Sequence, residues 1–145
     1  MITDGQTPTG APALSWMPPL DPTSPAPIYE QILEGVALAV AAGQLAPGAL
    51  LPSVRSLATA LRLNPNTTAR ALRAVERAGL ARAVRGVGMV VADDGRSKAA
   101  ELARRALERE LASAVRVARQ LGMERPALVA ALERVWQENG HADRG

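Results

Sequence analysis

Cysteine is absent from this 145-residue chain, and histidine occurs only once, as His141. Without cysteine there is no disulfide, no thiolate nucleophile and no cysteine-ligated zinc. A single histidine argues against a Ser-His-Asp apparatus and against a metal site built from several histidines. We therefore expect no enzyme, no metal and no other cofactor.

Aromatic residues are also scarce, because phenylalanine is absent and only Trp16, Tyr29 and Trp136 occur. Hydrophobic residues nevertheless make up 48% of the chain, which is enough for a core. That core must be built from Leu, Val, Ile and Ala, and such residues favour close-packed helices over a β-sandwich.

The chain lacks a long apolar run and a basic N-terminal stretch. Residues 35–54 are uncharged, but Gly43, Pro47 and Pro52 interrupt them. The uninterrupted apolar part, residues 36–42, is far shorter than the roughly 20 residues of a membrane-spanning helix. No Lys or Arg precedes Arg55, so the basic start of a secretory signal is missing. We expect a soluble cytoplasmic protein that does not bind membranes.

Proline and composition divide the chain into four regions. Residues 1–26 hold six prolines among Gly, Thr and Ser, so we expect a flexible arm there. Residues 27–92 carry the periodic pattern of a folded domain. Residues 93–96 are typical of a linker, and residues 97–140 predict a tail of two helices.

The folded domain begins with a helix and a short strand. Pro27 fits the first position of a helix, and Gly43 is a natural stop for it. Leu50 and Leu51 form a short apolar run before Pro52, which indicates a short strand.

Two further helices and a hairpin follow. Ser53 predicts the N-cap of the second helix, and Asn64 followed by proline predicts the start of a third that ends at Gly79. Residues 80–84 and 89–92 predict two strands joined by a glycine-bearing tip. This order predicts a mainly α fold with a small β wing, namely a winged helix-turn-helix domain followed by a two-helix tail.

The two tail helices carry apolar faces that they cannot bury alone. In the first tail helix, the apolar residues from Leu107 to Leu121 are spaced 4, 3, 4 and 3 positions apart, as in a helix that pairs with another helix. Packing within one chain would explain this spacing nearly as well. We favour a second copy of the chain and thus a homodimer. The expected dimerisation residues are Leu107, Leu111, Ala114, Ala118, Leu121, Leu128, Leu132 and Trp136.

The basic excess is concentrated in the folded domain. Residues 27–92 carry seven Arg and three Glu, a net charge of +4, whereas residues 1–26 carry −2 and residues 93–145 carry +1. On the third helix, Asn66, Arg70, Arg73 and Arg77 are spaced 4, 3, 4 and share one face. A charged helix face is usually only solvated surface, but here it coincides with a basic wing and with Arg55.

That coincidence predicts double-stranded DNA as the partner. The second helix of a helix-turn-helix enters the major groove, with its N-terminal residues nearest the bases. We therefore expect Asn66, Thr67 and Arg70 to read bases and Arg73 and Arg77 to contact phosphates. The remaining expected contacts are from Arg55 to a phosphate or outer base, and from Arg85, Gly86 and Gly88 to the minor groove.

The residues of this domain also resemble those of the GntR family of bacterial transcription regulators, from Pro27 to about Val91. The matching segments are Pro27-Ile28-Tyr29-Glu30-Gln31-Ile32, Gly43-Gln44-Leu45-Ala46-Pro47-Gly48, Leu51-Pro52-Ser53-Val54-Arg55-Ser56-Leu57-Ala58, Asn64-Pro65-Asn66-Thr67, Glu76-Arg77-Ala78-Gly79-Leu80 and Arg85-Gly86-Val87-Gly88. Together with Asn64-Pro65-Asn66-Thr67, the short tail resembles the YtrA-like branch, whose two-helix tail dimerises. The resemblance implies a homodimeric repressor on an inverted-repeat operator, often one that controls an operon for an ABC transporter.

The chain also departs from the family pattern. Other branches commonly place base-reading arginines at the positions of Pro65 and Ala69, so recognition here must rely on Asn66, Thr67 and Arg70. Tyr29 occupies a family position as well, and we expect it to pack in the core between the first helix and the wing.

Two alternatives compete with a DNA-binding regulator. A winged helix can serve as a protein-interaction module, but its third helix would then present a hydrophobic or acidic face. An enzyme would need a base, a metal set or a phosphate loop near its acidic residues, and none is evident. A small-molecule effector, whose identity the sequence does not indicate, has candidate positions between the tail helices and near Asp93 and Asp94.

Overall fold

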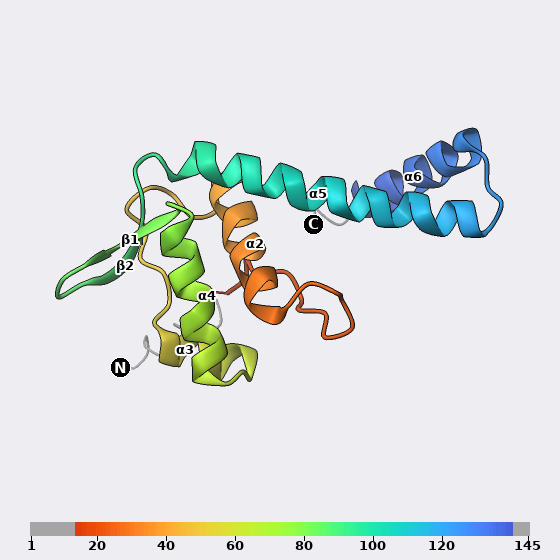
Figure 1. Cartoon of the computed structure of the whole chain (residues 1–145). Coiled ribbons are helices and arrows are strands. Elements are labelled where there is room, and N and C mark those ends of the chain that lie inside the picture. The colour runs from red at the N-terminus through yellow and green to blue at the C-terminus, as the bar shows by residue number, and fades with distance from the viewer. Residues whose placement is uncertain (1–13, 141–145) are drawn as a thin grey trace, which may run out of the picture. The chain divides into compact units, whose positions relative to one another are not determined.

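A computed structural model describes residues 14–140 of the chain, and within them the fold is mainly helical with one small sheet. The elements, in order, are α2 (Ile28–Ala41), α3 (Val54–Leu61), α4 (Pro65–Arg77), β1 (Ala81–Val84), β2 (Gly88–Val91), α5 (Gly95–Gln120) and α6 (Arg125–Gly140) (Figure 1). This order confirms the expected winged helix-turn-helix with two further helices. The chain divides into two compact units within α5, between Arg105 and Ala106. None of the helices in the described part has the length and hydropathy that crossing a membrane requires.

The start signals of α3 and α4 act as the sequence predicted. The side chain of Ser53 accepts a hydrogen bond from the Ser56 N–H at 3.1 Å, and that of Asn64 accepts one from the Asn66 N–H at 2.7 Å. Each cap satisfies an N–H group that the first helical turn leaves unpaired. Between the two helices, Arg62 adopts a left-handed conformation (φ 56°), which makes the tight turn.

The helix α2 is the centre of the core. It begins at Ile28 with Pro27 as its N-cap, one residue later than predicted, and it ends at Ala41, shortly before Gly43. One buried cluster joins Val36 and Val40 of α2 to side chains of α4, β1, β2 and the start of α5. A second cluster joins Ile32 of α2 to Leu57 of α3 and to Ala71 and Leu72 of α4. The two clusters hold α4 in place while its other face stays outside.

The sheet pairs β1 with β2 antiparallel, and the segment before α3 lies along the other edge of β2. The register places Ala81 opposite Val91 and Val84 opposite Gly88. The predicted strand at Leu50 and Leu51 is reduced to an isolated bridge between Leu50 and Val90. Backbone hydrogen bonds from Leu51 N to Met89 O (2.8 Å) and from Val91 N to Ala49 O (2.9 Å) flank this bridge.

Residues 14–26 lie against the domain, which differs from our expectation of a flexible arm over residues 1–26. The side chains of Leu14, Trp16, Met17 and Leu20 pack against the two core clusters. Gln31 of α2 fixes the segment: its amide nitrogen donates to Asp21 O at 2.8 Å and to the carbonyl of residue 26 at 2.9 Å. Its amide oxygen accepts from Asp21 N at 2.7 Å. Prolines prevent regular hydrogen bonding in this segment, but they do not prevent its apolar side chains from docking. Residues 1–13 of the expected arm lie outside the described residues.

The helix α5 begins at Gly95, so the expected linker over residues 93–96 is shortened to Asp93 and Asp94. Ser97, predicted as the cap, lies inside the helix, where its hydroxyl donates to the Asp94 carbonyl at 3.2 Å. Lys98 forms an ion pair with the Asp94 side chain at 3.1 Å, one turn earlier. Hydrogen bonding and charge from Lys98 lower the pKa of Asp94.

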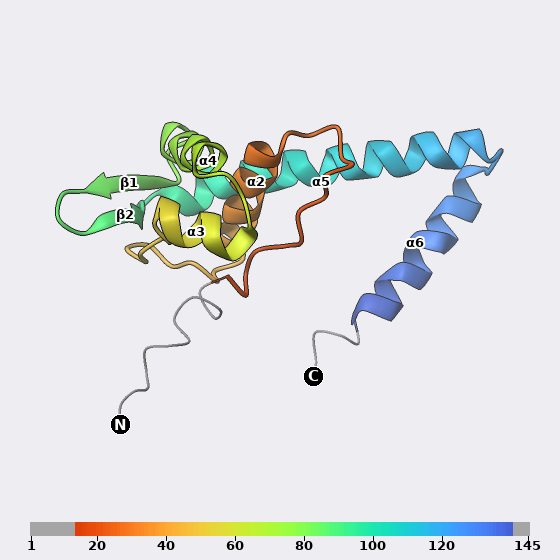
Figure 2. The same ribbon diagram turned by 90° about the horizontal axis from the view of Figure 1, so that it is seen from below.

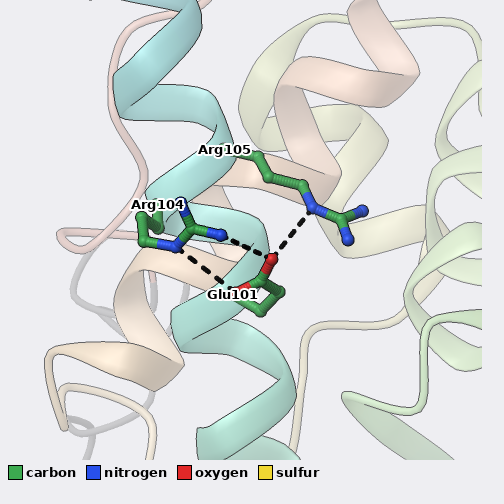
Figure 3. Close-up of polar contacts among 3 residues, drawn as sticks. All are labelled: Glu101, Arg104 and Arg105. Atoms are coloured by element: carbon green, nitrogen blue, oxygen red, sulfur yellow. Dashed lines mark hydrogen bonds and ion pairs between the residues drawn. The ribbon is translucent and has the colours of Figure 1, made fainter.

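Ion pairs on the exposed surface support the next turn of α5. Glu101 accepts from Arg104 at 2.8 Å and from Arg105 at 3.2 Å, at helical spacings of three and four (Figure 3). The Arg104 guanidinium is the main cause that lowers the pKa of Glu101. The carboxylate therefore stays ionised, and the contacts favour the helical conformation locally.

Candidate nucleic-acid interface

The predicted basic stripe lies on the outer face of α4. At about 100° per residue, Asn66, Arg70, Arg73 and Arg77 fall within about 60° of one another around the helix axis. All four side chains are exposed. On the opposite side of the same helix, Leu72 is 6% exposed and Val75 is fully buried. The helix therefore separates a packing face from a face of guanidinium groups, as its sequence predicted.

Polar side chains at the start of α4 have different environments. Asn66 is exposed, and Thr67 is half-buried at the edge of the stripe. The neighbouring Thr68 is fully buried, and its hydroxyl donates to the Asn64 carbonyl at 3.3 Å. The N-terminal turn is thus anchored by Asn64 and Thr68, which leaves Asn66 and Thr67 at the surface.

Arg70 has a contact that the sequence did not suggest. Its Cζ atom lies 4.0 Å from the centroid of the Tyr29 ring. The half-buried ring also packs against the second core cluster, whose buried members come from α2, α3 and α4 and not from the wing, where we expected the ring to pack. A guanidinium over an aromatic face is a cation–π contact, with a usual reach of about 6 Å.

Exposed arginines also border α4 on neighbouring elements of the same unit. Arg55 is in the first turn of α3, as predicted, and Arg85 is at the tip of the β1–β2 hairpin. Sequence reasoning gave no role to Arg62, in the turn between α3 and α4, or to Arg82 on β1, and both are exposed. The net charge of residues 27–92 could have pointed to Arg62 and Arg82, because they are two of its seven arginines.

The hairpin tip is a three-residue loop, residues 85–87, closed by a hydrogen bond from Val87 N to Val84 O at 3.0 Å. The hairpin extends away from the helices beside α4 in both views (Figure 1, Figure 2). Gly86 has φ +80° and Gly88 has φ +126°, a region that disfavours other residues. A Cβ atom on Gly86 would meet nothing within 4 Å, so backbone conformation and not space favours glycine there.

Among the described residues, no acidic side chain neutralises the positive charges of this surface. Within residues 14–140, none of the seven arginines between Arg55 and Arg85 forms an ion pair. Over the same part of the chain, no cluster of acidic or histidine side chains is suited to a metal ion. The arrangement can bind a polyanion by charge and by directed N–H donors.

A second surface lies between the C-terminal part of α5 and α6. Figure 2 shows these two helices joined at a turn and diverging from it. Gly122 in that turn has φ +71°. The helices enclose an open groove of about 670 Å³. Its lining is mostly apolar and includes Leu111, Ala114, Val115, Ala118, Met123, Leu128, Val129, Leu132 and Val135.

Most of the expected dimerisation residues are uncovered within one chain. Leu107 is 58% exposed, Leu121 70% and Trp136 71%, and Leu111 is exposed as well. Leu132 is 51% exposed, Ala114 is exposed and Leu128 is half-buried, and all three line the groove. Ala118 differs from the others, because it is 5% exposed and therefore already covered by its own chain.

Comparison with known proteins identifies the family. Residues 28–91 match the family described as bacterial regulatory proteins, gntR family. The chain is 39% identical to the HTH-type transcriptional repressor YtrA of Bacillus subtilis over 82 residues, which are 57% of this chain and 63% of that protein. The match thus spans somewhat less than two thirds of that relative.

Solved structures extend the similarity beyond the winged helix. A GntR family transcriptional regulator from Listeria monocytogenes is 27% identical with a TM-score of 0.64, over 79% of this chain and 98% of that one. YtrA from Sulfolobus acidocaldarius, a GntR-family transcription factor, is 32% identical with a TM-score of 0.52, over 68% of this chain and 99% of that one. The chain therefore belongs to the GntR family, in its YtrA-like branch.

Proposed function

We propose that this chain is a sequence-specific DNA-binding transcription regulator that acts as a homodimeric repressor on an inverted-repeat operator. The observation that carries the proposal is the stripe of exposed side chains on α4, whose arginines have no acidic partner among the described residues. A recognition helix needs such a face, anchored to the body by its other side. The role is one of binding and not of catalysis, in line with a family of regulators.

Each side chain of the surface has a proposed task. Asn66, Thr67 and Arg70 lie in the N-terminal half of α4 and read base edges, because Asn can bridge adenine N6/N7 and Arg can bridge guanine O6/N7. Further along α4, Arg73 and Arg77 contact phosphates and so fix the orientation of the helix. The contacts outside α4 come from Arg55 at the start of α3 and from Arg85, Gly86 and Gly88 of the hairpin.

The homodimer is proposed from the uncovered apolar surface of α5 and α6. A single chain leaves Leu107, Leu121 and Trp136 more than half exposed and leaves the groove open. Burying such side chains stabilises by roughly 1.5–3 kcal/mol each, so a partner surface is strongly favoured. A second copy carries the same faces, and a two-fold axis would let each copy cover the other. Two copies would present two α4 helices to the two half-sites of an inverted repeat.

The biological setting follows from the family. The Bacillus subtilis relative is named a repressor, and we propose the same sense of regulation here. The YtrA-like resemblance implies an operon for an ABC transporter as the regulated unit. We place the protein in the cytoplasm, where the chromosome lies. A protein-interaction module would instead be favoured by an acidic or apolar face on α4, which carries arginines.

The proposal is tested by fluorescence anisotropy with a duplex from the promoter of the chain's own gene and a random duplex of equal length. We expect preference for the promoter duplex. Arg70→Ala should weaken specific binding by about 1–3 kcal/mol for each bidentate pair of hydrogen bonds to a base that it removes. Arg116→Ala is the matched control, because it removes one charge from an exposed position of α5 outside this surface.

Two results would contradict the proposal. Equal affinity of the wild type for both duplexes at every salt concentration would remove sequence specificity. If Arg70→Ala left both affinity and base preference unchanged, α4 would not be the reading element.

A further inference from the structure

We propose that Tyr29 is a positioning residue for Arg70, which it holds in the orientation needed to read a base. The inference rests on the proposed function, in which Arg70 contacts a base edge. It starts from the 4.0 Å distance between Arg70 Cζ and the centroid of the Tyr29 ring. The contact joins α2, which does not belong to the helix-turn-helix pair, to the middle of the proposed reading helix α4.

The Tyr29 ring is itself held in place. Tyr29 is the second residue of α2, is half-buried, and packs against the buried cluster that includes Ile32 and Leu72. Its hydroxyl donates to Glu30 Oε1 at 3.3 Å. The ring is therefore a platform attached to the core, and a guanidinium resting on it is attached indirectly.

Stacking leaves the donors of Arg70 available. The N–H groups of a guanidinium point outward in its own plane, so a ring beneath that plane does not use them. Within residues 14–140, Arg70 forms no hydrogen bond and no ion pair. An arginine in this state can donate two parallel hydrogen bonds to O6 and N7 of a guanine.

Preorganisation is what the ring contributes. A free arginine loses considerable rotamer entropy when it is fixed on a base, and this loss weakens binding. A side chain that is already restricted before DNA arrives loses less. The Tyr29 ring should therefore strengthen binding to the preferred sequence, and it should matter only while Arg70 is present.

A double-mutant cycle tests this dependence in the full chain. The probe is the duplex that the wild type selects from a random-sequence library, with a scrambled duplex as the reference. Tyr29→Leu keeps an apolar side chain but removes the ring. It should weaken binding about two- to five-fold for each half-site, and therefore about four- to 25-fold for the homodimer on the selected duplex, as expected for one exposed cation–π contact per chain. In the Arg70→Ala background the same substitution should change affinity by less than a factor of about 1.5.

Substitutions that keep the ring provide the matched controls. Tyr29→Phe should bind the selected duplex as the wild type does. The chain contains no phenylalanine, so fluorinated phenylalanines incorporated into the Tyr29→Phe variant replace this one ring only. Fluorine weakens the negative face of the ring with little change in size. Affinity should fall stepwise with the number of fluorines when Arg70 is present and stay constant in the Arg70→Ala background.

The stacking can also be seen without DNA. Tyr29 is the only tyrosine, so tyrosine-selective labelling gives one set of ring NMR signals. Arg70→Ala should shift these signals in the free protein. Thermal unfolding of each variant separates damage to the core from removal of the stacking.

The outcomes distinguish this inference from the function on which it rests. If Tyr29→Leu bound the selected duplex as tightly as the wild type or more tightly, the stacked state would not be the reading state. An equal reduction of affinity in the Arg70→Ala background would make Tyr29 a packing residue only. If the library yielded no preferred duplex, the proposed function would fail, and this inference with it.

Discussion

Replacing Arg73 by alanine is expected to reduce the salt dependence of DNA binding while leaving base preference intact. Arg73 is exposed on the α4 stripe and has no ion pair within the described residues, so its charge is free to displace a counterion from a phosphate. Its position beyond Arg70 along α4 assigns it to the DNA backbone and not to a base. Removing it should therefore weaken binding to all sequences alike.

The size of the effect follows from the proposed phosphate pairing. Arg73 and Arg77 would contact phosphates, and we count the charges of Arg55 and of Arg85 in the minor groove as one neutralised phosphate each, which gives eight neutralised phosphates in a dimer. At about −0.9 per phosphate, the slope of log K against log salt should be about −7 for the wild type and about −5 for Arg73→Ala, which neutralises two fewer. Between about 50 and 200 mM salt, affinity should then fall about 20,000-fold for the wild type and about 2,000-fold for the variant.

The measurement is fluorescence anisotropy with one labelled duplex over a series of salt concentrations. Arg116→Ala serves as the control, because it removes the same charge from α5 and should keep the wild-type slope. Equal slopes for wild type and Arg73→Ala would refute the phosphate contact. A wild-type slope near half the expected value would instead refute the two-copy arrangement.

Three further changes test the dimer, the start of α4 and the docked segment. Leu111→Glu places a charge in the apolar groove and should halve the mass measured by light scattering. Ala112 does not line the groove, so the Ala112→Glu variant should stay dimeric. A wild type that is monomeric at micromolar concentration would contradict the dimer. Asn64→Ala removes the N-cap of α4 and should lower the free energy of unfolding in urea by about 1 kcal/mol, so an unchanged value would count against the cap. Gly35→Ala would bring a Cβ atom within 2.5 Å of Met17 Sδ, but it also gains about 1 kcal/mol of helix propensity inside α2, so the two effects on stability oppose each other. The expected result is faster chymotryptic cleavage in residues 14–26, and unchanged cleavage would show that Met17 does not pack tightly on Gly35.

The winged helix could be predicted from the sequence because its signals are local. Ser53 and Asn64 cap helices through hydrogen bonds to residues two or three positions away, and the hairpin tip is formed by a few consecutive residues. The basic stripe of α4 is likewise a matter of helical periodicity within one element. Such features need no knowledge of what packs against them.

Other features could not be predicted because they depend on contacts between distant segments. Composition correctly argues that proline-rich residues 14–26 form no helix, but it does not show that Trp16 and Met17 find a place on the core or that Gln31 fixes Asp21. The contact between Arg70 and Tyr29 joins residues 41 positions apart, through the packing of α2 with α4. The sequence shows that each side chain exists, and only the fold brings them together.

The strand β2 has a partner on both sides, since residues 49–51 pair with it opposite β1. Those residues lead directly into Ser53 and α3, so the backbone that carries Arg55 is joined by hydrogen bonds to the strand that carries the hairpin tip. The hairpin therefore does not move independently of α3. To bind a duplex with a wider or narrower groove, the whole domain would have to change its orientation on the DNA. The spacing between the backbones of Arg55 and Arg85 is therefore constant, and it makes binding sensitive to the groove width of the duplex.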